Sequence, residues 1–247
     1  MHVQIPPYHD VIRGMRWAFC LLFWCAATSV AWADLPLKAN DDGTLEFQVT
    51  KPSRTLVVFV SGDGGLWGDL DVQVAKRMVQ EGYAVVGLDT RMWFAEERQA
   101  ADVAARLAGM MRTYMARAHA TRVVLAGYSY GADVLPIAYN RLAPDYRAKI
   151  AALVLIAPTR QTMLQVTLAE RTGLITGDIR LAPEYAKLPV KSVICVYGHD
   201  EAGEAGCTLP ELQNAVNIER PGGHHFDYNG KELGDHIIAA LKAMGLP

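Results

Sequence analysis

Residues 127–131 read Gly-Tyr-Ser-Tyr-Gly, and this pentapeptide is the strongest indication of the fold in the sequence. It follows an apolar run at 122–126 that is typical of a buried strand, and it leads into residues 132–135, which can continue as a helix. Two glycines around a serine, between a strand and a helix, are typical of a turn too tight for bulky side chains. We therefore expect Ser129 to occupy this turn, with its hydroxyl projecting from the carboxyl edge of a sheet.

The rest of the chain supplies the strands and helices that such a turn needs. Continuous apolar runs predict strands buried on both faces at 55–60, 84–88, 150–156 and 190–196. Residues 44–49 alternate like an edge strand, and a short last strand is predicted at 215–218. Helical spacing occurs at 70–80, 95–118 and 233–244. Residues 162–172 fit neither period; they receive no structure, but in a hydrolase they would lie over the active site as a small cap.

Buried strands that alternate with helices predict an α/β fold with a mostly parallel, doubly wound sheet and flanking helices. Together with the G-x-S-x-G turn, this pattern indicates the α/β-hydrolase fold, with a small cap or none. We expect a signal peptide at 1–33, a lead with an edge strand at 34–50, and the hydrolase domain at 51–247. The formal charge of −2 gives no sign of the basic face that nucleic acid binding requires.

The amino-terminal segment has the pattern of a secretory signal peptide. Arg13 and Arg16 precede an apolar run at 17–30, and residues 31–33, Ala-Trp-Ala, fit a cleavage site. The alternative is an uncleaved membrane anchor, although the run is shorter than the roughly 20 residues that a spanning helix needs. We therefore expect a periplasmic protein.

Export affects the interpretation of the cysteines. Once the signal is removed, Cys195 and Cys207 remain, and an even pair in an oxidising compartment predicts a disulfide. The alternative is a buried thiol at Cys195 and a loop thiol at Cys207. A disulfide would clamp the loop that carries Asp200 and Glu201.

A serine nucleophile needs a base and an acid that orients the base. In the α/β-hydrolase fold these follow in the order serine, acid, histidine, each after a strand. The acid is Asp200 or Glu201, which come after the strand predicted at 190–196, and we favour Asp200. His224 directly follows a glycine pair after the last strand, so we predict that it is the base and that His225 packs behind it.

A metal site is the alternative use of these histidines, with His199, Asp200, His224 and His225 as ligands. No helical H-x-x-x-H or other ligand spacing supports it. We therefore predict neither a metal nor another cofactor.

The oxyanion hole of this fold uses the backbone N–H after the nucleophile and one from the loop after the first buried strand. The first is that of Tyr130, and the loop, residues 61–65, reads Ser-Gly-Asp-Gly-Gly. We expect Asp63 or Gly64 to be the second donor, although a plain glycine turn has the same pattern.

Three further residues are candidates for binding substrate. Arg91 and Trp93 follow the strand predicted at 84–88, and Trp67 follows the glycine-rich loop. Arg91 could meet a phosphate and the tryptophans an acyl chain or a bilayer surface, although core or cap packing is the commoner use of such aromatics. Asp133 lies in the first turn of the helix after Ser129, where a carboxylate suits the helix dipole.

Three motifs resemble those of a known family. They are Ser-Gly-Asp-Gly-Gly at 61–65, Gly-Tyr-Ser-Tyr-Gly-Ala-Asp-Val-Leu-Pro at 127–136, and Pro-Gly-Gly-His-His-Phe at 221–226. They are similar to the bacterial virulence protein VirJ/AcvB family, from Lys51 to the carboxyl terminus. The signal peptide and the cysteine pair around the acid loop match the family as well.

The resemblance implies a periplasmic α/β-hydrolase linked to type IV secretion, with secretion components or substrates as partners. It implies Ser129, His224 and Asp200 or Glu201 as the triad. It also implies hydrolysis of aminoacyl-phosphatidylglycerol, a phospholipid, at the membrane surface. Longer members carry an additional amino-terminal domain that has no counterpart in these 247 residues.

Overall fold

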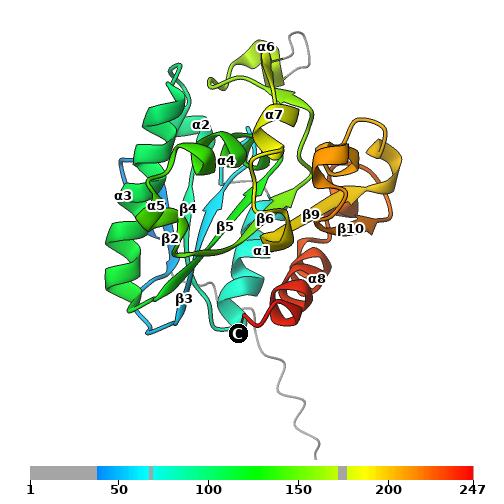
Figure 1. The fold of residues 1–247 in the computed structure, drawn as a ribbon. Helices are drawn as coiled ribbons and strands as arrows, with labels where there is room; N and C mark the ends of the chain where they lie inside the picture. Colours follow the sequence, from blue (N-terminus) through cyan, green and yellow to red (C-terminus); the bar gives the residue numbers. More distant parts are fainter. Residues whose placement is uncertain (1–37, 67–68, 172–176, 247) are drawn as a thin grey trace, which may run out of the picture. The chain divides into compact units, whose positions relative to one another are not determined.

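A mixed sheet with the strand order β1-β2-β4-β3-β5-β6-β9-β10 forms the centre of the fold (Figure 1). A computed structural model describes residues 38–66, 69–171 and 177–246. The strands are β1 (Lys38–Ala39), β2 (Thr44–Gln48), β3 (Thr55–Val60), β4 (Ala84–Leu88), β5 (Arg122–Tyr128), β6 (Ile150–Ile156), β9 (Val193–Gly198) and β10 (Val216–Arg220). The run from β4 to β10 is parallel, and β1 and β2 are antiparallel. The predicted mostly parallel sheet with flanking helices is therefore confirmed.

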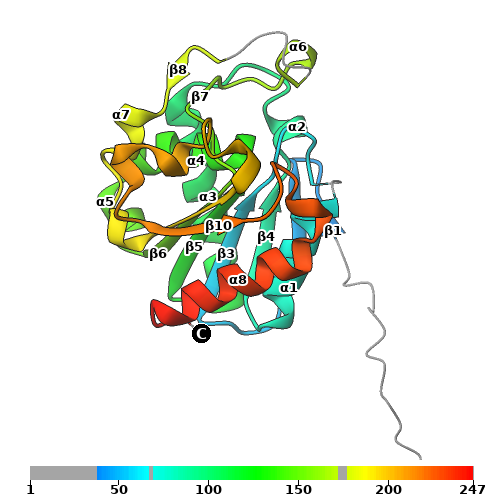
Figure 2. The ribbon, with the colours of Figure 1, turned by 90° about the vertical axis from the view of Figure 1, so that its right-hand side faces the viewer.

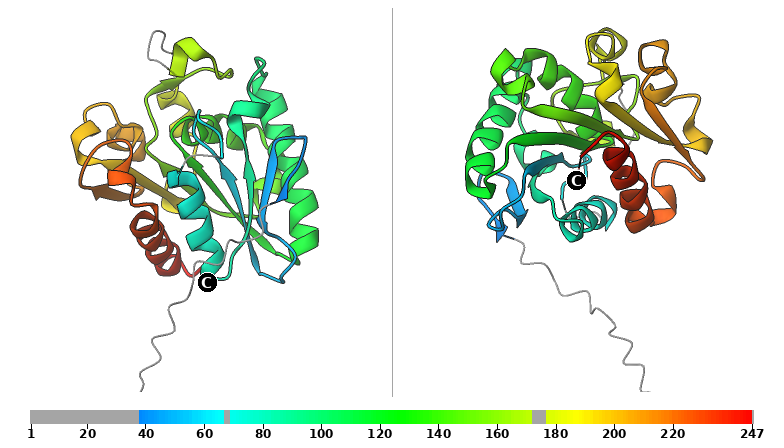
Figure 3. Two further views of the ribbon diagram at one scale, coloured as in Figure 1. Left: turned by 180° about the vertical axis from the view of Figure 1, so that it is seen from behind. Right: turned by 60° about the horizontal axis from the view of Figure 1, so that its bottom comes forward.

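Two pairs of helices cover the two faces of this sheet. On one face lie α3 (Ala100–Ala118) and α4 (Tyr130–Arg141). On the other, α1 (Asp69–Gln80) and α8 (Gly230–Ala243) lie side by side (Figures 2 and 3). Consecutive residues of a strand pack into the hydrophobic cores on opposite faces of the sheet, because side chains alternate across a sheet.

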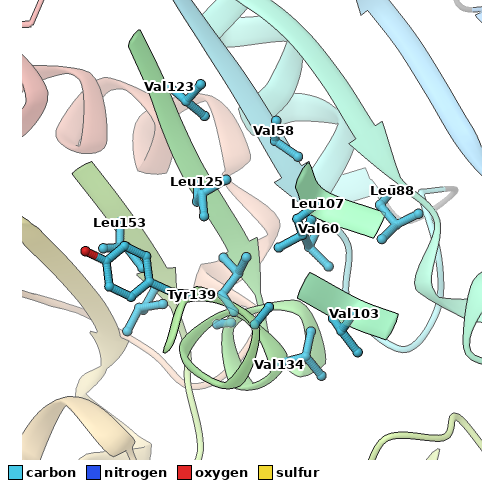
Figure 4. Packing of buried hydrophobic residues seen from close by; sticks show 14 of the residues in the cluster. Val58, Val60, Leu88, Val103, Leu107, Val123, Leu125, Val134, Tyr139 and Leu153 are labelled. Carbon is cyan, nitrogen blue, oxygen red and sulfur yellow. The ribbon is translucent and has the colours of Figure 1, made fainter. Parts of the chain in front are cut away.

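The core under α3 and α4 shows this packing in detail (Figure 4). Val58, Val123 and Leu125 point from neighbouring strands toward Leu107 of α3 and Val134 of α4, and all five side chains are almost fully buried. The opposite core takes the alternate residues of the same strands. Strands β3, β4 and β6 occupy the ranges that the apolar runs predict, because burial on both faces requires an unbroken apolar run.

The strand predicted at the edge is not the edge. β1 pairs outside β2, and residues 44–47 are all buried. The alternation of polar and apolar residues wrongly indicated an edge strand because the polar residue Glu46 is buried. Arg117 of α3 contacts both of its carboxylate oxygens, at 2.7 and 2.8 Å. An ion pair with a helix 71 residues away cannot be anticipated from the local pattern.

Several other element boundaries also differ from the prediction, among them α8, which begins at Gly230 and not at 233, and β10, which continues to Arg220 and not to 218. The helix expected at 95–118 begins at Ala100, where Gln99 and Asp102 form a reciprocal cap. A separate short helix, α2 (Thr90–Trp93), precedes it and is capped by Asp89, which accepts from the N–H of Met92. The strand expected from 190 begins at Val193, because residues after Pro189 form a 3₁₀ turn.

A small cap lies beyond the carboxyl ends of β5 and β6, at the top of Figure 1. It contains the two-residue strands β7 (Gln161–Thr162) and β8 (Ile179–Arg180) and the short helices α6 (Leu168–Arg171) and α7 (Ala182–Tyr185). A further short helix, α5 (Pro144–Arg147), follows α4. No structure was predicted for residues 162–172, but this stretch contains the last residue of β7 and the single helical turn of α6.

The predicted signal peptide at 1–33 and Trp67 lie outside the described residues. The part of the chain that the structure describes contains no helix long and apolar enough to cross a membrane.

Candidate active site

Ser129 stands on the sharp turn between β5 and α4, with φ 52° and ψ −120°. A positive φ is strained for a residue with a side chain, and such strain is typical of functional positions. The turn closes only because the residues two positions before and after the serine are glycines, which lack side chains. A Cβ on Gly131 would lie 2.1 Å from the carbonyl oxygen of Val60, and one on Gly127 would lie 2.6 Å from the backbone of Gly131. The G-x-S-x-G turn is therefore a steric requirement.

Three side chains form a continuous chain of hydrogen-bond contacts from this serine. Ser129 Oγ lies 2.8 Å from Nε2 of His224, and Nδ1 of His224 lies 2.9 Å from Oε2 of Glu201. His224 and Glu201 are both partly buried. These are the distances and the order of a nucleophile, its base and the acid that orients the base.

The carboxylate that contacts His224 is that of Glu201, so the geometry does not support the preference for Asp200. Residues His199–Glu201 form a 3₁₀ turn directly after β9, in which successive side chains point about 120° apart. The N–H of Asp200 donates to the carbonyl oxygen of Gly222 at 3.0 Å, and its side chain is exposed. That contact fixes the rotation of the turn and directs the next residue, Glu201, toward His224.

The loop that carries His224 is held by the loop before it and by the nucleophile strand. A Cβ on Gly198 would lie 2.5 Å from the carbonyl oxygen of Gly223, so the two loops touch through their backbones. The hydroxyl of Tyr128 lies 3.2 Å from the carbonyl oxygen of His224 and 2.9 Å from Nδ1 of His225. His225 thus lies beside the base, as predicted, and bonds the residue that precedes Ser129.

Opposing influences act on the pKa of His224. Burial is the largest influence on the pKa of His224 and lowers it, but the hydrogen bond and charge of Glu201 raise it, with smaller contributions from Asp133 and Asp63. The net effect is a raised pKa. Oε1 of Glu201 is buried without a hydrogen-bond partner among the described residues, so Oε2 makes the carboxylate's principal contact.

The glycine-rich loop after β3 lies against the nucleophile. A Cβ on Gly62 would be 3.7 Å from the Cβ of Ser129. The N–H of Gly62 donates to Asp71 at 3.0 Å, and the N–H of Leu66 donates to Asp89 at 3.3 Å. These two buried carboxyl groups hold the ends of the loop and leave Asp63 and Gly64, the predicted donors, at its tip.

Tyr130 follows the nucleophile directly, as the predicted oxyanion donor must. It is the first residue of α4, where N–H groups point out of the helix end toward negative charge. Its ring is buried and packs edge-on against Phe94, with centroids 5.1 Å apart.

A cavity of about 650 Å³ opens beside Ser129 and His224. It lies between α4 and the cap, and its lining includes Thr159, Thr162, Met163 and Gly177. Arg91 and Trp93 do not line it: Arg91 is exposed on α2, and Trp93 packs under Arg98 and against Phe94. The substrate-binding role predicted for these two residues is therefore not supported.

Asp133 is a lining residue whose place in the site the sequence prediction missed. Its carboxylate accepts from the N–H of Thr159 and lies 2.7 Å from the hydroxyl of the same residue, in addition to its place at the helix start. The position four residues after Ser129 was the available signal, because such a spacing puts two side chains on one helix face.

A disulfide joins Cys195 of β9 to Cys207, as predicted, with a Cα–Cα distance of 5.6 Å. It closes the loop that contains Glu201. Within residues 38–66, 69–171 and 177–246, no group of three or more histidine, cysteine, aspartate or glutamate side chains is arranged to hold a metal ion.

Comparison with known proteins agrees with this architecture. The profile of the bacterial virulence protein (VirJ) family matches residues 54–244. The chain belongs to the VirJ family. No curated protein shows a significant match to the sequence.

Solved structures share the fold at low sequence identity. The VirJ-family chain superposes on MGS-MChE2, an α/β-hydrolase enzyme from the metagenome of lagoon sediments of Mar Chica, Morocco, with a TM-score of 0.59 and 14% identity over 85% of this chain and 100% of that one. For Est1E from Butyrivibrio proteoclasticus the TM-score is 0.56 and the identity 14%, over 83% of this chain and 98% of that one. For MenH from S. aureus the TM-score is 0.58 and the identity 13%, over 82% of this chain and 99% of that one. The VirJ-family chain thus has the α/β-hydrolase fold, with a Ser-His-Glu arrangement at its nucleophile turn.

Proposed function

We propose that this protein is a periplasmic serine esterase that releases the amino acid from aminoacyl-phosphatidylglycerol. The observation that carries the esterase is the contact chain Ser129–His224–Glu201, with distances of 2.8 and 2.9 Å. The lipid substrate rests on membership of the VirJ family and on the motifs at 61–65, 127–136 and 221–226. Export rests on the signal pattern at 1–33.

The geometry supports a two-step reaction. Oγ of Ser129 attacks the ester carbonyl carbon while its proton moves to Nε2 of His224, and Glu201 stabilises the imidazolium that forms. Backbone N–H groups of Tyr130 and of the loop tip at Asp63 and Gly64 stabilise the oxyanion. The bond to the leaving alcohol then breaks, and the alcohol takes the proton from Nε2.

Water completes the cycle by the same route. It attacks the acyl-enzyme carbonyl carbon and gives a proton to His224, and collapse of this intermediate frees the amino acid and regenerates Ser129. No step requires a cofactor.

The test uses the protein from Asp34 onward with vesicles that contain lysyl- or alanyl-phosphatidylglycerol, beside a short-chain p-nitrophenyl ester. Ser129→Ala, which removes the nucleophile but adds no bulk, is the matched control. Amino acid release by the wild type and not by Ser129→Ala is the expected result. Cleavage of the small ester alone would discard the lipid substrate. Failure on every ester would favour a non-catalytic accessory protein of secretion.

A further inference from the structure

A second functional group lies one helical turn beyond the nucleophile. The N–H of Asp133 donates to the carbonyl oxygen of Ser129 at 3.1 Å, so the residue is fixed relative to the reacting serine. Asp133 lines the same cavity as Ser129 and His224, and only 4% of its surface is exposed. A carboxylate buried this deeply is costly to keep charged unless its surroundings or a ligand compensate it.

Thr159 holds this carboxylate in one orientation. Its N–H donates to Oδ1 at 2.7 Å, and its hydroxyl lies 2.7 Å from Oδ2. Thr159 is held in turn by Tyr185, whose buried hydroxyl donates to the carbonyl oxygen of Thr159 at 2.7 Å. A group that is positioned before the ligand arrives loses little conformational entropy on binding, which favours affinity.

The cavity around Asp133 is acidic. Beside His224 and Tyr130, its ionisable lining residues are three carboxylates, Asp133, Glu201 and Glu204, and one guanidinium, that of Arg160. The guanidinium lies by Thr208 and the carbonyl oxygen of Ala205, at 3.2 and 3.5 Å. The charge of Asp133 also acts on the catalytic base, because it helps to raise the pKa of His224. This balance of charge attracts a cationic acyl group.

We propose that Asp133 binds the α-ammonium group of an aminoacyl ester and so selects this acyl group at the site; the idea rests on the esterase proposed above. In such an ester the ammonium nitrogen lies about 2.5 Å from the carbonyl carbon, by standard bond lengths and angles. The carbonyl carbon must approach Oγ of Ser129 to roughly 3 Å. The backbone hydrogen bond between Asp133 and Ser129 and the cavity that both side chains line place the carboxylate on the side of the serine where that nitrogen must lie.

The test compares two soluble esters that differ only in the proposed contact. The alanyl p-nitrophenyl ester carries an α-ammonium group where the isobutyryl p-nitrophenyl ester carries a methyl group of similar size. Rates are measured at pH 6.5, where an α-amino group is largely protonated, and are divided by uncatalysed rates because the ammonium also activates the ester.

We expect the wild type to prefer the alanyl ester. Asp133→Asn keeps an acceptor for Thr159 and removes the charge. It should lower the preference for the alanyl ester, measured as the ratio of kcat/KM for the alanyl ester to that for the isobutyryl ester, about 10- to 100-fold, the loss expected for one charge-assisted hydrogen bond. An effect of the lost charge on the pKa of His224 acts on both esters and cancels in this ratio. An exposed carboxylate of α5, Asp145, gives the matched control Asp145→Asn.

Two results would overturn the proposal: equal losses on both esters in Asp133→Asn, or no preference in the wild type. Binding provides a test that needs neither turnover nor a folded variant. In an NMR titration of the wild type, alaninamide should bind at least about 10-fold more tightly than isobutyramide. Absence of turnover with tight alaninamide binding would reject the esterase and retain the ammonium site, whereas equal binding of the two amides would reject the site.

Discussion

Glu201 and Asp200 carry the same charge on adjacent positions, but only Glu201 reaches His224, at 2.9 Å. We expect Glu201→Gln to lower kcat by about 10²- to 10⁴-fold, because an amide neither stabilises the imidazolium nor fixes the productive tautomer of His224. Asp200→Asn is the matched control. It should stay within about 3-fold of the wild type, since the exposed side chain lies away from the base. Ester hydrolysis by purified variants measures both, and a larger loss in Asp200→Asn would restore the original assignment.

The pH dependence of the rate follows from the surroundings of His224. Burial is the largest influence and lowers its pKa, but Glu201, Asp133 and Asp63 raise it overall above the ordinary value of 6.5. Protonated imidazole cannot accept the serine proton, so kcat/KM should rise with pH through an inflection above 6.5. In Glu201→Gln the inflection should move to lower pH. A wild-type inflection below 6.5 on a p-nitrophenyl ester would contradict this picture.

Residue identity at the site was predictable wherever the backbone dictates it. Ser129 must occupy a turn between two glycines, and His224 follows a glycine pair at a strand end, so both follow from sequence. The choice between Asp200 and Glu201 does not, because it depends on the contact between Asp200 and Gly222 in another loop. The cavity role of Asp133 was missed because its partner, Thr159, lies 26 residues away in the cap.

Among helices and strands, the boundaries that depend on local sequence were predicted correctly, and those that depend on contacts with distant residues were not. Strands β3, β4 and β6 are buried on both faces, and their apolar runs are long enough to define their ends. The start of α3 depends on the cap at Gln99, and the position of β2 depends on the ion pair of Glu46 with Arg117. Polar contacts between distant elements leave no periodic signal in the sequence.

The disulfide between β9 and the 3₁₀ turn Gly206–Thr208 should support both stability and catalysis. Both cysteines are buried, and the bond closes a loop over a sequence separation of 12 residues that includes Glu201. On the chain-entropy account, its loss should cost roughly 3 kcal/mol of unfolding free energy. We also expect kcat to fall under conditions where the fold persists, because the acid loop loses its anchor.

The measurement is urea unfolding and ester hydrolysis of the double variant Cys195→Ser, Cys207→Ser beside the oxidised wild type. Wild type treated with reductant provides the control for the effect of the serine side chains. If stability and kcat are unchanged in both the double variant and the reduced wild type, the disulfide contributes neither to stability nor to the position of the acid loop.

The whole molecule places its reactive groups at one edge of the sheet. Ser129, Glu201 and His224 follow β5, β9 and β10, the glycine-rich loop 61–65 follows β3, and Thr159 follows β6. All five parallel strands end at the same edge, which is where open α/β sheets bind ligands. This edge also gathers the carboxyl groups Asp63, Asp71, Asp89 and Asp133, so its assembly has a cost that the rest of the fold must offset.

The cost of burying these carboxyl groups should be measurable through Asp71, which is almost fully buried and accepts from the N–H of Gly62 in the glycine-rich loop. Burial, with the nearby charges of Asp63 and Asp89, raises its pKa from the ordinary value of 3.8 to about 7, although the N–H of Gly62 opposes the shift. Because the folded-state pKa is the higher one, the stabilising contribution is complete below pH 3.8 and is lost as pH rises toward 7. Between pH 5 and 8 the wild type should lose roughly 3 kcal/mol through this group.

Asp71→Asn retains an oxygen that can accept from Gly62 but has no charge to bury, so it should not show this loss. The difference in unfolding free energy between variant and wild type, measured in urea at pH 5 and at pH 8, should therefore grow in favour of the variant at the higher pH. Groups that titrate equally in both proteins cancel in this difference, and Asp145→Asn controls for the loss of an exposed charge. An equal difference at the two pH values would mean that Asp71 is ionised throughout and that the edge of the sheet accommodates its charge.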